Sequence, residues 1–512
     1  AIEKQLSAPY VQTRRAESPE GPRPTASQVA PAEQSAPLSR EQQARVLRAL
    51  REMGLPSVAV VAAGEEDEPH ADLAGEVVAV PGPEAYLDPG AMVEAARRSG
   101  AQAIHPGYGF LSQSAAFARA CRDAGVVFIG PSPEAMAALG DKRAARKTAE
   151  GLGIPVVPGA RAVDSAAAAE QAAARVGYPV LLKAAGGGGG RGMRRVERAD
   201  DLREAFEAAR REARAAFGDD RLLLEKYVSP ARHVEVQILA DGREAVAVGD
   251  RECSLQRRYQ KVIEEAPCAA LSERTRGEIF EAAVKLARVV GYRSAGTVEF
   301  LVGSDGRAWF LEVNTRLQVE HPVTELVTGI DLVRAQIELA QGGKLPDPPP
   351  PRGHAIEARL NAEDPYRGFL PQTGKILGLH FPHLPGLRVD AGIREGSRVG
   401  ARYDSLLAKL VAWGKDRETA RRRLVEALRE TVLLGIQTNQ AFLLAVLESG
   451  MFVRGETFTT TLEATSWPEP PVPPEAEMAA RRVLEAPVRE EGGGRRDAWS
   501  PWATMGPFRV GS

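Results

Sequence analysis

The segment 297-TVEFLVGSDGRAWFLEVNTR constrains the fold more than any other part of the chain. Two apolar runs flank 303-GSDG, a strong turn signal, so we predict a β-hairpin. Pairing about this turn places Glu299 opposite Glu312 on one face, where two carboxylates repel each other unless a cation lies between them. The hairpin therefore predicts a Mg²⁺ or Mn²⁺ site, with Asn314 as a further oxygen ligand. Exposed acids without a metal are the alternative.

A second feature is the run of five glycines from Gly186 to Gly190, which follows an apolar strand ending in Lys183. Glycine tolerates positive φ and lets bare backbone N–H groups approach an anion. The spacing fits neither the P-loop nor the dinucleotide-binding fingerprint. A flexible linker is the alternative, but Arg191 and a second strand follow directly. We therefore predict a loop that covers phosphate groups.

The segment 316-RLQVEHPVTE follows the hairpin and is rich in groups that could act on a substrate. Arg316 can clamp an anion, and Glu320, four residues later, is placed to act as a general base. His321 precedes a proline, and we interpret it as a structural hydrogen-bonding group rather than a catalyst.

Two further segments concentrate charge. In 253-CSLQRRYQKVIEEAP three basic residues, including Lys261, precede two acids, which indicates a compact charged network rather than a solvated basic face. In 224-LEKYV an apolar run ends in Glu225. We expect the backbone there to read an adenine edge while this carboxylate accepts a hydrogen bond.

Composition limits the classes of partner. The net charge of −2 argues against nucleic acid, and no apolar run approaches the length of a membrane span. No signal peptide is visible at the first residues. Cys121, Cys253 and Cys268 lack metal-ligand spacing and cannot all pair, which fits a reducing compartment. These observations predict a cytoplasmic protein without a nucleic-acid or membrane partner.

The length of 512 residues and the alternation of short apolar runs with helical stretches predict an α/β and α+β multidomain protein. Nine strings in collinear order over about 39–462 resemble the biotin carboxylase family, a branch of the ATP-grasp fold. These strings are 105-HPGYGFLS, 140-GDK, 183-KAAGGGGGRGM, 225-EKY, 232-RHVEVQ, 261-KVIEEAP, 312-EVNTRLQVEHPVTE, 359-RLNAEDP and 403-YDSLLAKL.

The resemblance implies a division into domains. It predicts a disordered or atypical amino-terminal segment at 1–38, a Rossmann-like domain at 39–140, and an ATP-grasp domain at 141–345 with a lid at about 154–228. It also predicts a biotin carboxylase C-terminal domain at 352–464 and, at 465–512, a Pro- and Glu-rich linker that leads into a downstream region. The prolines of 346-PDPPPPRG would form a stiff connector between the last two domains.

The same resemblance implies how ATP and metal are held. The residues expected to bind ATP are Lys142, Lys183, Gly189, Gly190, Glu225, Lys226, Tyr227, Val228, His233, Tyr259, Glu299, Leu301 and Glu312. The expected ligands of Mg²⁺ or Mn²⁺ are Glu299, Glu312 and Asn314.

The resemblance further implies a carboxylation reaction. The residues expected around bicarbonate and biotin are Lys261, Arg316, Gln318, Val319 and Arg359, with Glu320 as the base that deprotonates bicarbonate. Carboxyphosphate would form and break down to CO₂ and phosphate, which takes the proton from the biotin ureido nitrogen. Arg359 would then stabilise the biotin enolate. Lid closure would protect the short-lived intermediate from water.

Three features depart from the family pattern. Tyr259 replaces a histidine, Gln113 replaces a carboxylate, and the opening strand with its Asn-Arg-Gly-Glu-Ile-Ala turn is absent. The stretch 28-QVAPAEQSAPL has two prolines and no apolar alternation, so it makes a poor central strand. We therefore expect 1–38 to be disordered, order to begin at the capping box 39-SREQ, and the first domain to be less stable than the rest.

No Ala-Met-Lys-Met string occurs, so biotin is expected as a substrate on a carrier and not attached to this chain. The implied partners are a biotin carboxyl carrier protein or domain, a carboxyltransferase subunit and a second copy in a homodimer. The tail 497-DAWSPWATMGPFRVG favours an acyl-CoA carboxylase of acetyl-, propionyl- or methylcrotonyl-CoA type. The alternatives are another bicarbonate-phosphorylating ATP-grasp ligase and a degenerate, non-catalytic subunit with an assembly role.

Overall fold

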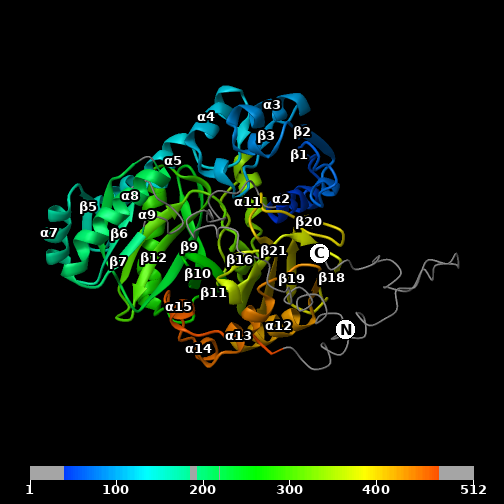
Figure 1. Ribbon diagram of the computed structural model, residues 1–512. Helices are drawn as coiled ribbons and strands as arrows, with labels where there is room; N and C mark the ends of the chain where they lie inside the picture. The colour runs from blue at the N-terminus through cyan, green and yellow to red at the C-terminus, as the bar shows by residue number, and fades with distance from the viewer. Residues whose placement is uncertain (1–39, 185–192, 218, 472–512) are drawn as a thin grey trace, which may run out of the picture.

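The computed structural model describes residues 40–184, 193–217 and 219–471 (Figure 1). The expectations for 1–38, for Gly189 and Gly190, and for the tail beyond 471 therefore lie outside the described residues. Within the described ranges, no helix combines the length and apolar character needed to cross a membrane.

The amino-terminal unit splits its strands between two sheets. β1 (Val58–Ala62) pairs in parallel with β2 (Glu76–Val80), and β3 (Ala103–Ile104) pairs in parallel with β4 (Val127–Phe128). Side chains of Asp88, Ser114 and Ser132 cap the helices that begin at the next residue. The helices of this unit are α2 (Arg40–Glu52), α3 (Pro89–Ser99), α4 (Ala115–Asp123) and α5 (Pro133–Gly140).

Helix α2 is anchored to distant parts of the chain through buried ion pairs. Arg45 lies 3.0 Å from Glu325 and 2.7 Å from Asp331. Lys409 Nζ lies 3.1 Å from Glu41 Oε1, and both side chains are fully buried. Glu41, the third residue of the predicted capping box 39-SREQ, thus serves the packing of α2 against the carboxyl-terminal unit.

A four-stranded antiparallel sheet in the order β5-β8-β6-β7 forms the unit at 159–226. Alanines of its first helix and Phe206 of its second fill the space over one face of the sheet. The glycine run would connect β6 to β7. The elements are β5 (Gly159–Val163), α7 (Ala166–Val176), β6 (Val180–Ala184), β7 (Met193–Val196), α8 (Leu202–Phe217) and β8 (Leu222–Lys226).

The centre of the molecule is an eight-stranded sheet in the order β13-β12-β9-β10-β11-β14-β21-β19. Its strands are β9 (Ala231–Asp241), β10 (Ala245–Arg257), β11 (Gln260–Ala266), β12 (Arg293–Gly303), β13 (Ala308–Asn314), β14 (His354–Asn361), β19 (Leu387–Ala391) and β21 (Leu406–Gly414). Helices α6 (Lys142–Gly151), α9 (Glu273–Val289), α10 (His321–Thr328) and α11 (Leu332–Ala340) pack against it. The predicted hairpin is confirmed as β12 and β13, with its turn at 303-GSDG.

Strand β14 pairs with β11, so the central sheet continues across the proline-rich connector into the carboxyl-terminal unit. Helix α12 packs on β21 and β14 and closes the largest apolar core. The helices here are α12 (Arg417–Glu430), α13 (Gln440–Glu448), α14 (Gly450–Arg454) and α15 (Thr461–Ala464). Short strand pairs complete the unit: β15 (Glu363–Asp364) with β16 (Leu370–Pro371), β17 (Gly374–Lys375) with β20 (Arg398–Val399), and β18 (Gly378–His380) with β22 (Val432–Leu434).

Candidate active site

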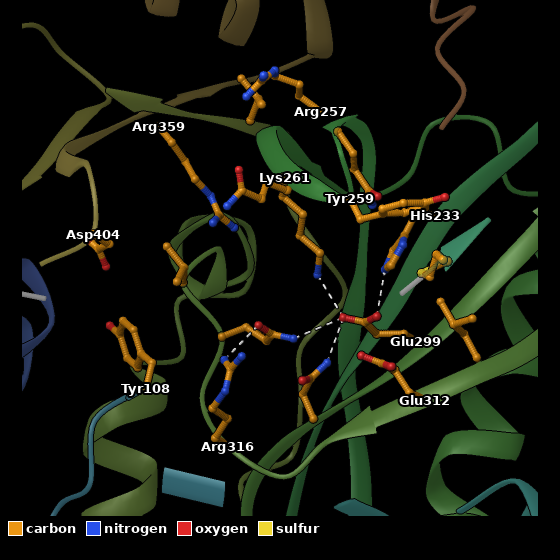
Figure 2. Close-up of a pocket in the computed structure, with 18 of the residues that line it drawn as sticks. Tyr108, His233, Arg257, Tyr259, Lys261, Glu299, Glu312, Arg316, Arg359 and Asp404 are labelled. Atoms are coloured by element: carbon orange, nitrogen blue, oxygen red, sulfur yellow. Dashed lines mark hydrogen bonds and ion pairs between the residues drawn. The ribbon is translucent and has the colours of Figure 1, made fainter. Parts of the chain in front are cut away.

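A cavity of about 270 Å³ lies where the unit at 159–226 meets the central sheet. Figure 2 shows its charged side chains converging from β9, β11, β12, β13 and β14. The predicted residues that line it are Lys142, Lys183, Glu225, His233, Tyr259, Lys261, Glu299, Glu312, Asn314, Arg316, Gln318, Val319 and Arg359.

Three carboxylates form a row across adjacent strands beneath this cavity. Glu299 on β12 pairs in register with Glu312 on β13, as the hairpin predicted, and with Glu235 on β9. Residues directly opposite each other in a ladder present their side chains to the same face. The row therefore concentrates negative charge that only cations or hydrogen-bond donors can offset.

Glu299 is surrounded by donors. Its Oε1 accepts hydrogen bonds from Asn314 at 2.8 Å and Gln318 at 3.2 Å, and its Oε2 lies 3.1 Å from His233 Nε2. Burial alone would raise the pKa of this carboxyl, but Lys261 and His233 together lower the pKa far below its usual range. Glu299 is therefore ionised at neutral pH and ready to accept a cation.

Lys261 sits at the meeting point of three carboxylates. Its Nζ lies 2.6 Å from Glu235, 2.9 Å from Glu299 and 2.6 Å from Glu320. Burial would lower the pKa of this amine, yet the three carboxylates raise it well above its usual value. The predicted charged network around 253–267 is thus present, with Lys261 as its central cation.

Glu320 is fully buried between Lys261 and Arg359. Arg359 lies 3.1 Å from Glu320 Oε2 and donates from its Nε to Glu264 at 2.6 Å. Burial would raise the pKa of Glu320, but the two cations lower it well below its ordinary value. Arg316, which we expected beside Glu320, instead donates to Gln318 Oε1 at 3.0 Å and to the carbonyl of Leu317.

Basic residues gather at the other end of the cavity. Lys183 bonds to Glu225 Oε2, and Arg146 donates to Glu225 Oε1 at 2.5 Å. Lys142, the first residue of α6, lies 2.6 Å from Glu312. These side chains bring several cationic groups to this end of the cavity.

Some expected ATP residues contact other parts of the chain. The Lys226 amine donates to the carbonyl of Tyr178 at 2.6 Å, and the guanidinium of Arg195 lies 4.2 Å from the ring centre of Tyr227. Leu301 pairs with His233 in the sheet. Val228 follows the end of β8.

Tyr259 lies in the tight turn between β10 and β11, and its side chain is 49% exposed at the cavity mouth.

His321 is buried and faces Tyr108 edge-on, and its Nδ1 lies 2.8 Å from the carbonyl of Gln318. Burial lowers the pKa of His321 well below its usual value. A neutral, buried imidazole agrees with the structural role expected for it.

Three residues of the charged network were not predicted from the sequence: Arg146, Glu235 and Arg251. Arg251 is fully buried, and its Nε donates to Glu235 at 2.5 Å. The alternation of polar and apolar residues in 232-RHVEVQ was the available signal, since it places His233 and Glu235 on one face of a strand.

The donor set fits a hard divalent cation. One atom each of His233, Glu235 and Glu299 lies within 4.8 Å of the other two. The row from Glu235 to Glu312 offers carboxylate oxygens, the ligands that Mg²⁺ and Mn²⁺ prefer.

Comparison with known proteins assigns the family. Residues 39–136 match the family described as biotin carboxylase, N-terminal domain, 141–347 match the carbamoyl-phosphate synthase L chain, ATP binding domain, and 357–464 match the biotin carboxylase C-terminal domain. A biotin carboxylase from Nostoc is 44% identical over 427 residues, which are 82% of this chain and 96% of that protein. The chain belongs to the biotin carboxylase family. It is accordingly an ATP-dependent ligase.

Two further members of the biotin carboxylase family extend the likeness. The α subunit of a mitochondrial methylcrotonoyl-CoA carboxylase from Dictyostelium discoideum is 43% identical over 481 residues, 91% of this chain and 68% of that subunit. The solved biotin carboxylase domain dimer of 2-oxoglutarate carboxylase from Hydrogenobacter thermophilus has a TM-score of 0.80 and 39% identity, covering 84% of this chain and 97% of that one.

Proposed function

We propose that this chain is the biotin carboxylase component of an acyl-CoA carboxylase, which carboxylates biotin on a carrier with ATP and bicarbonate. The observation that carries this proposal is the joint network of Lys261, Glu320 and Arg359 beside the carboxylate row. The end of the cavity with Lys142 and Lys183 could bind a nucleotide with its metal ion, and the end with Lys261 and Arg359 could bind a small anion. Phosphoryl transfer to bicarbonate requires these two sites to adjoin.

Each part of the network has a proposed task. Glu299, Glu312 and Asn314 would hold Mg²⁺, which when bound neutralises phosphate charge. Lys142 and Lys183 would leave their carboxylate partners for phosphate oxygens. Gln318, Val319 and Arg316 would orient bicarbonate, and Glu320 would accept its proton. The solved Hydrogenobacter domain is described in complex with MgADP and bicarbonate, which supports this division.

Arg359 is proposed to stabilise the biotin enolate. Its guanidinium is held by Glu264 and Glu320, so it is already oriented and partly charge-balanced. Burial raises the pKa of Glu264 to about 7. Protonation of Glu264 near neutral pH would therefore leave Arg359 with more positive charge to offer an enolate oxygen.

The partners remain those that the sequence predicted: a biotin carrier, a carboxyltransferase subunit and a second copy of this chain. The Hydrogenobacter domain is described as a dimer, which supports the last of these. The methylcrotonoyl-CoA carboxylase likeness supports an acyl-CoA carboxylase. A cytoplasmic location stays a prediction, because that relative is named as mitochondrial.

The test is ATP cleavage measured with Mg²⁺ and bicarbonate, with and without free biotin. We expect bicarbonate-dependent cleavage that biotin stimulates, with carboxybiotin as a product. Equal turnover without biotin, and no carboxybiotin, would assign the chain to another bicarbonate-phosphorylating ligase. Absence of any turnover would favour the non-catalytic subunit, which the complete set of Lys261, Arg316, Glu320 and Arg359 argues against.

A further inference from the structure

Arg146, which the sequence did not predict as a site residue, lines the active-site cavity beside Lys183 and Glu225. It lies on α6, four residues after Lys142, and this spacing places both side chains on one face of the helix. The side chain of Arg146 is only 14% exposed. A charged group with so little contact with water needs acceptors within the protein.

Three acceptors surround the guanidinium of Arg146. Its Nη1 donates to Glu225 Oε1 at 2.5 Å, its Nη2 donates to the carbonyl of Val157, and its Nε lies 3.4 Å from Glu150 Oε1. Val157 precedes β5, and Glu225 lies near the end of β8, so Arg146 contacts the chain at both ends of the unit at 159–226. The three nitrogens belong to one rigid planar group, and these contacts together fix its position.

The Glu225 carboxylate is shared between two cations. Lys183 bonds to its Oε2, while Arg146 holds its Oε1. Burial alone would raise the pKa of this carboxyl, but Lys183 and Arg146 lower the pKa below its usual value. Glu225 is therefore ionised, and each of its oxygens faces a cation.

The two cations differ in how readily they can leave Glu225. Lys183 lies near the end of β6, just ahead of the glycine run, and under the proposed function its amine moves to the phosphates of the bound nucleotide. Arg146 is held in addition by Val157 and Glu150, whose contacts a nucleotide does not replace. A buried carboxylate that loses its last cation is strongly disfavoured. Once Lys183 has moved, Arg146 is the cation that keeps Glu225 paired.

We propose that Arg146 is a positioning residue for the nucleotide. It holds Glu225 through Oε1 after Lys183 has moved to the phosphates, so that Oε2 stays in the cavity and accepts a hydrogen bond from the nucleotide. Arg146 acts through Glu225 and not by contact with the phosphates. This inference rests on the proposed function, because it requires Lys183 to exchange a carboxylate for a phosphate.

The test is a double-mutant cycle on MgATP affinity, measured by calorimetry with the full chain. Arg146→Met should weaken MgATP binding at least about tenfold, because Lys183 must then either stay with Glu225 or leave that carboxylate unpaired. Glu225→Gln removes the charge that needs a partner. In a chain that carries Glu225→Gln, adding Arg146→Met should therefore change the affinity by less than about threefold.

Two further variants separate the charge of Arg146 from its contact with the backbone and from general damage. Arg146→Gln keeps a donor for the carbonyl of Val157 but has no charge, so it should weaken MgATP binding as Arg146→Met does. Arg334→Met is the matched control, because Arg334 on α11 also pairs with a glutamate four residues later, at 2.8 Å, but is 57% exposed. This control should bind MgATP as the unaltered chain does.

A loss of affinity above about threefold for Arg146→Met in the Glu225→Gln background would overturn the proposal, since Arg146 would then act on the phosphates or through Val157. A loss of affinity in Arg146→Met or Arg146→Gln that is no larger than in Arg334→Met would also overturn it. A failure of the proposed function looks different. The unaltered chain itself would then not bind MgATP, and both proposals would fall together.

Discussion

Replacing Lys261 with methionine tests whether this amine holds the site together as well as serving the reaction. The substitution keeps the length of the side chain but removes the cation shared by Glu235, Glu299 and Glu320, at 2.6, 2.9 and 2.6 Å. Removing one partner of a buried ion pair typically costs about 3–5 kcal/mol, since the remaining charges stay buried. We expect a loss of free energy of unfolding on this order at pH 8.

The loss should depend on pH with a definite sign. In the unaltered chain, Lys261 lowers the folded-state pKa of Glu299 and Glu320 below the ordinary 4.5, so both stabilise the fold above that pH. Without the cation, we expect burial to raise the pKa of these carboxylates above 4.5, so that the variant loses stability relative to the parent as pH rises. The gap between variant and parent should therefore be largest at pH 8 and shrink towards pH 5.

The assay is urea unfolding at pH 5.5 and pH 8. Lys226→Met is the matched control, because the Lys226 amine contacts only backbone carbonyls among the contacts that the described residues show for it, at 2.6 Å and 3.1 Å. This control should cost about 1 kcal/mol and vary little with pH. A loss below 1 kcal/mol for Lys261→Met, or an equal loss at both pH values, would refute the assigned role of the network.

Three further predictions address the reaction, the fold and the carrier. Glu320→Gln should lower the rate of biotin carboxylation about 10²- to 10⁴-fold, while nucleotide binding, measured by calorimetry, is retained. A normal rate of carboxylation would exclude Glu320 as the general base. Burial would raise the pKa of Glu265, but hydrogen bonds from His354 and Arg417 lower it to about 2, so its stabilisation is present above pH 4.5 and is lost as pH falls towards 2. Glu265→Gln should thus cost about 3 kcal/mol in urea unfolding at pH 7 and almost nothing near pH 2; a constant difference would contradict the linkage. An avidin blot of protein made with a biotin ligase should be blank, and a labelled band would show that a lysine of this chain carries biotin.

The local parts of the site could be predicted because short-range rules govern them. A turn signal between two apolar runs sets the register of a hairpin, and that register alone brings Glu299 opposite Glu312. The period of two in a strand likewise puts His233 and Glu235 on one face. Family likeness added the roles of residues such as Arg359, which no spacing rule suggests.

The partners of the buried charges were decided only by the tertiary structure. Glu264 and Arg359 lie 95 positions apart in the chain, and Lys261 and Glu320 lie 59 positions apart. Such contacts depend on the order of strands in the sheet, which the local pattern of residues does not specify.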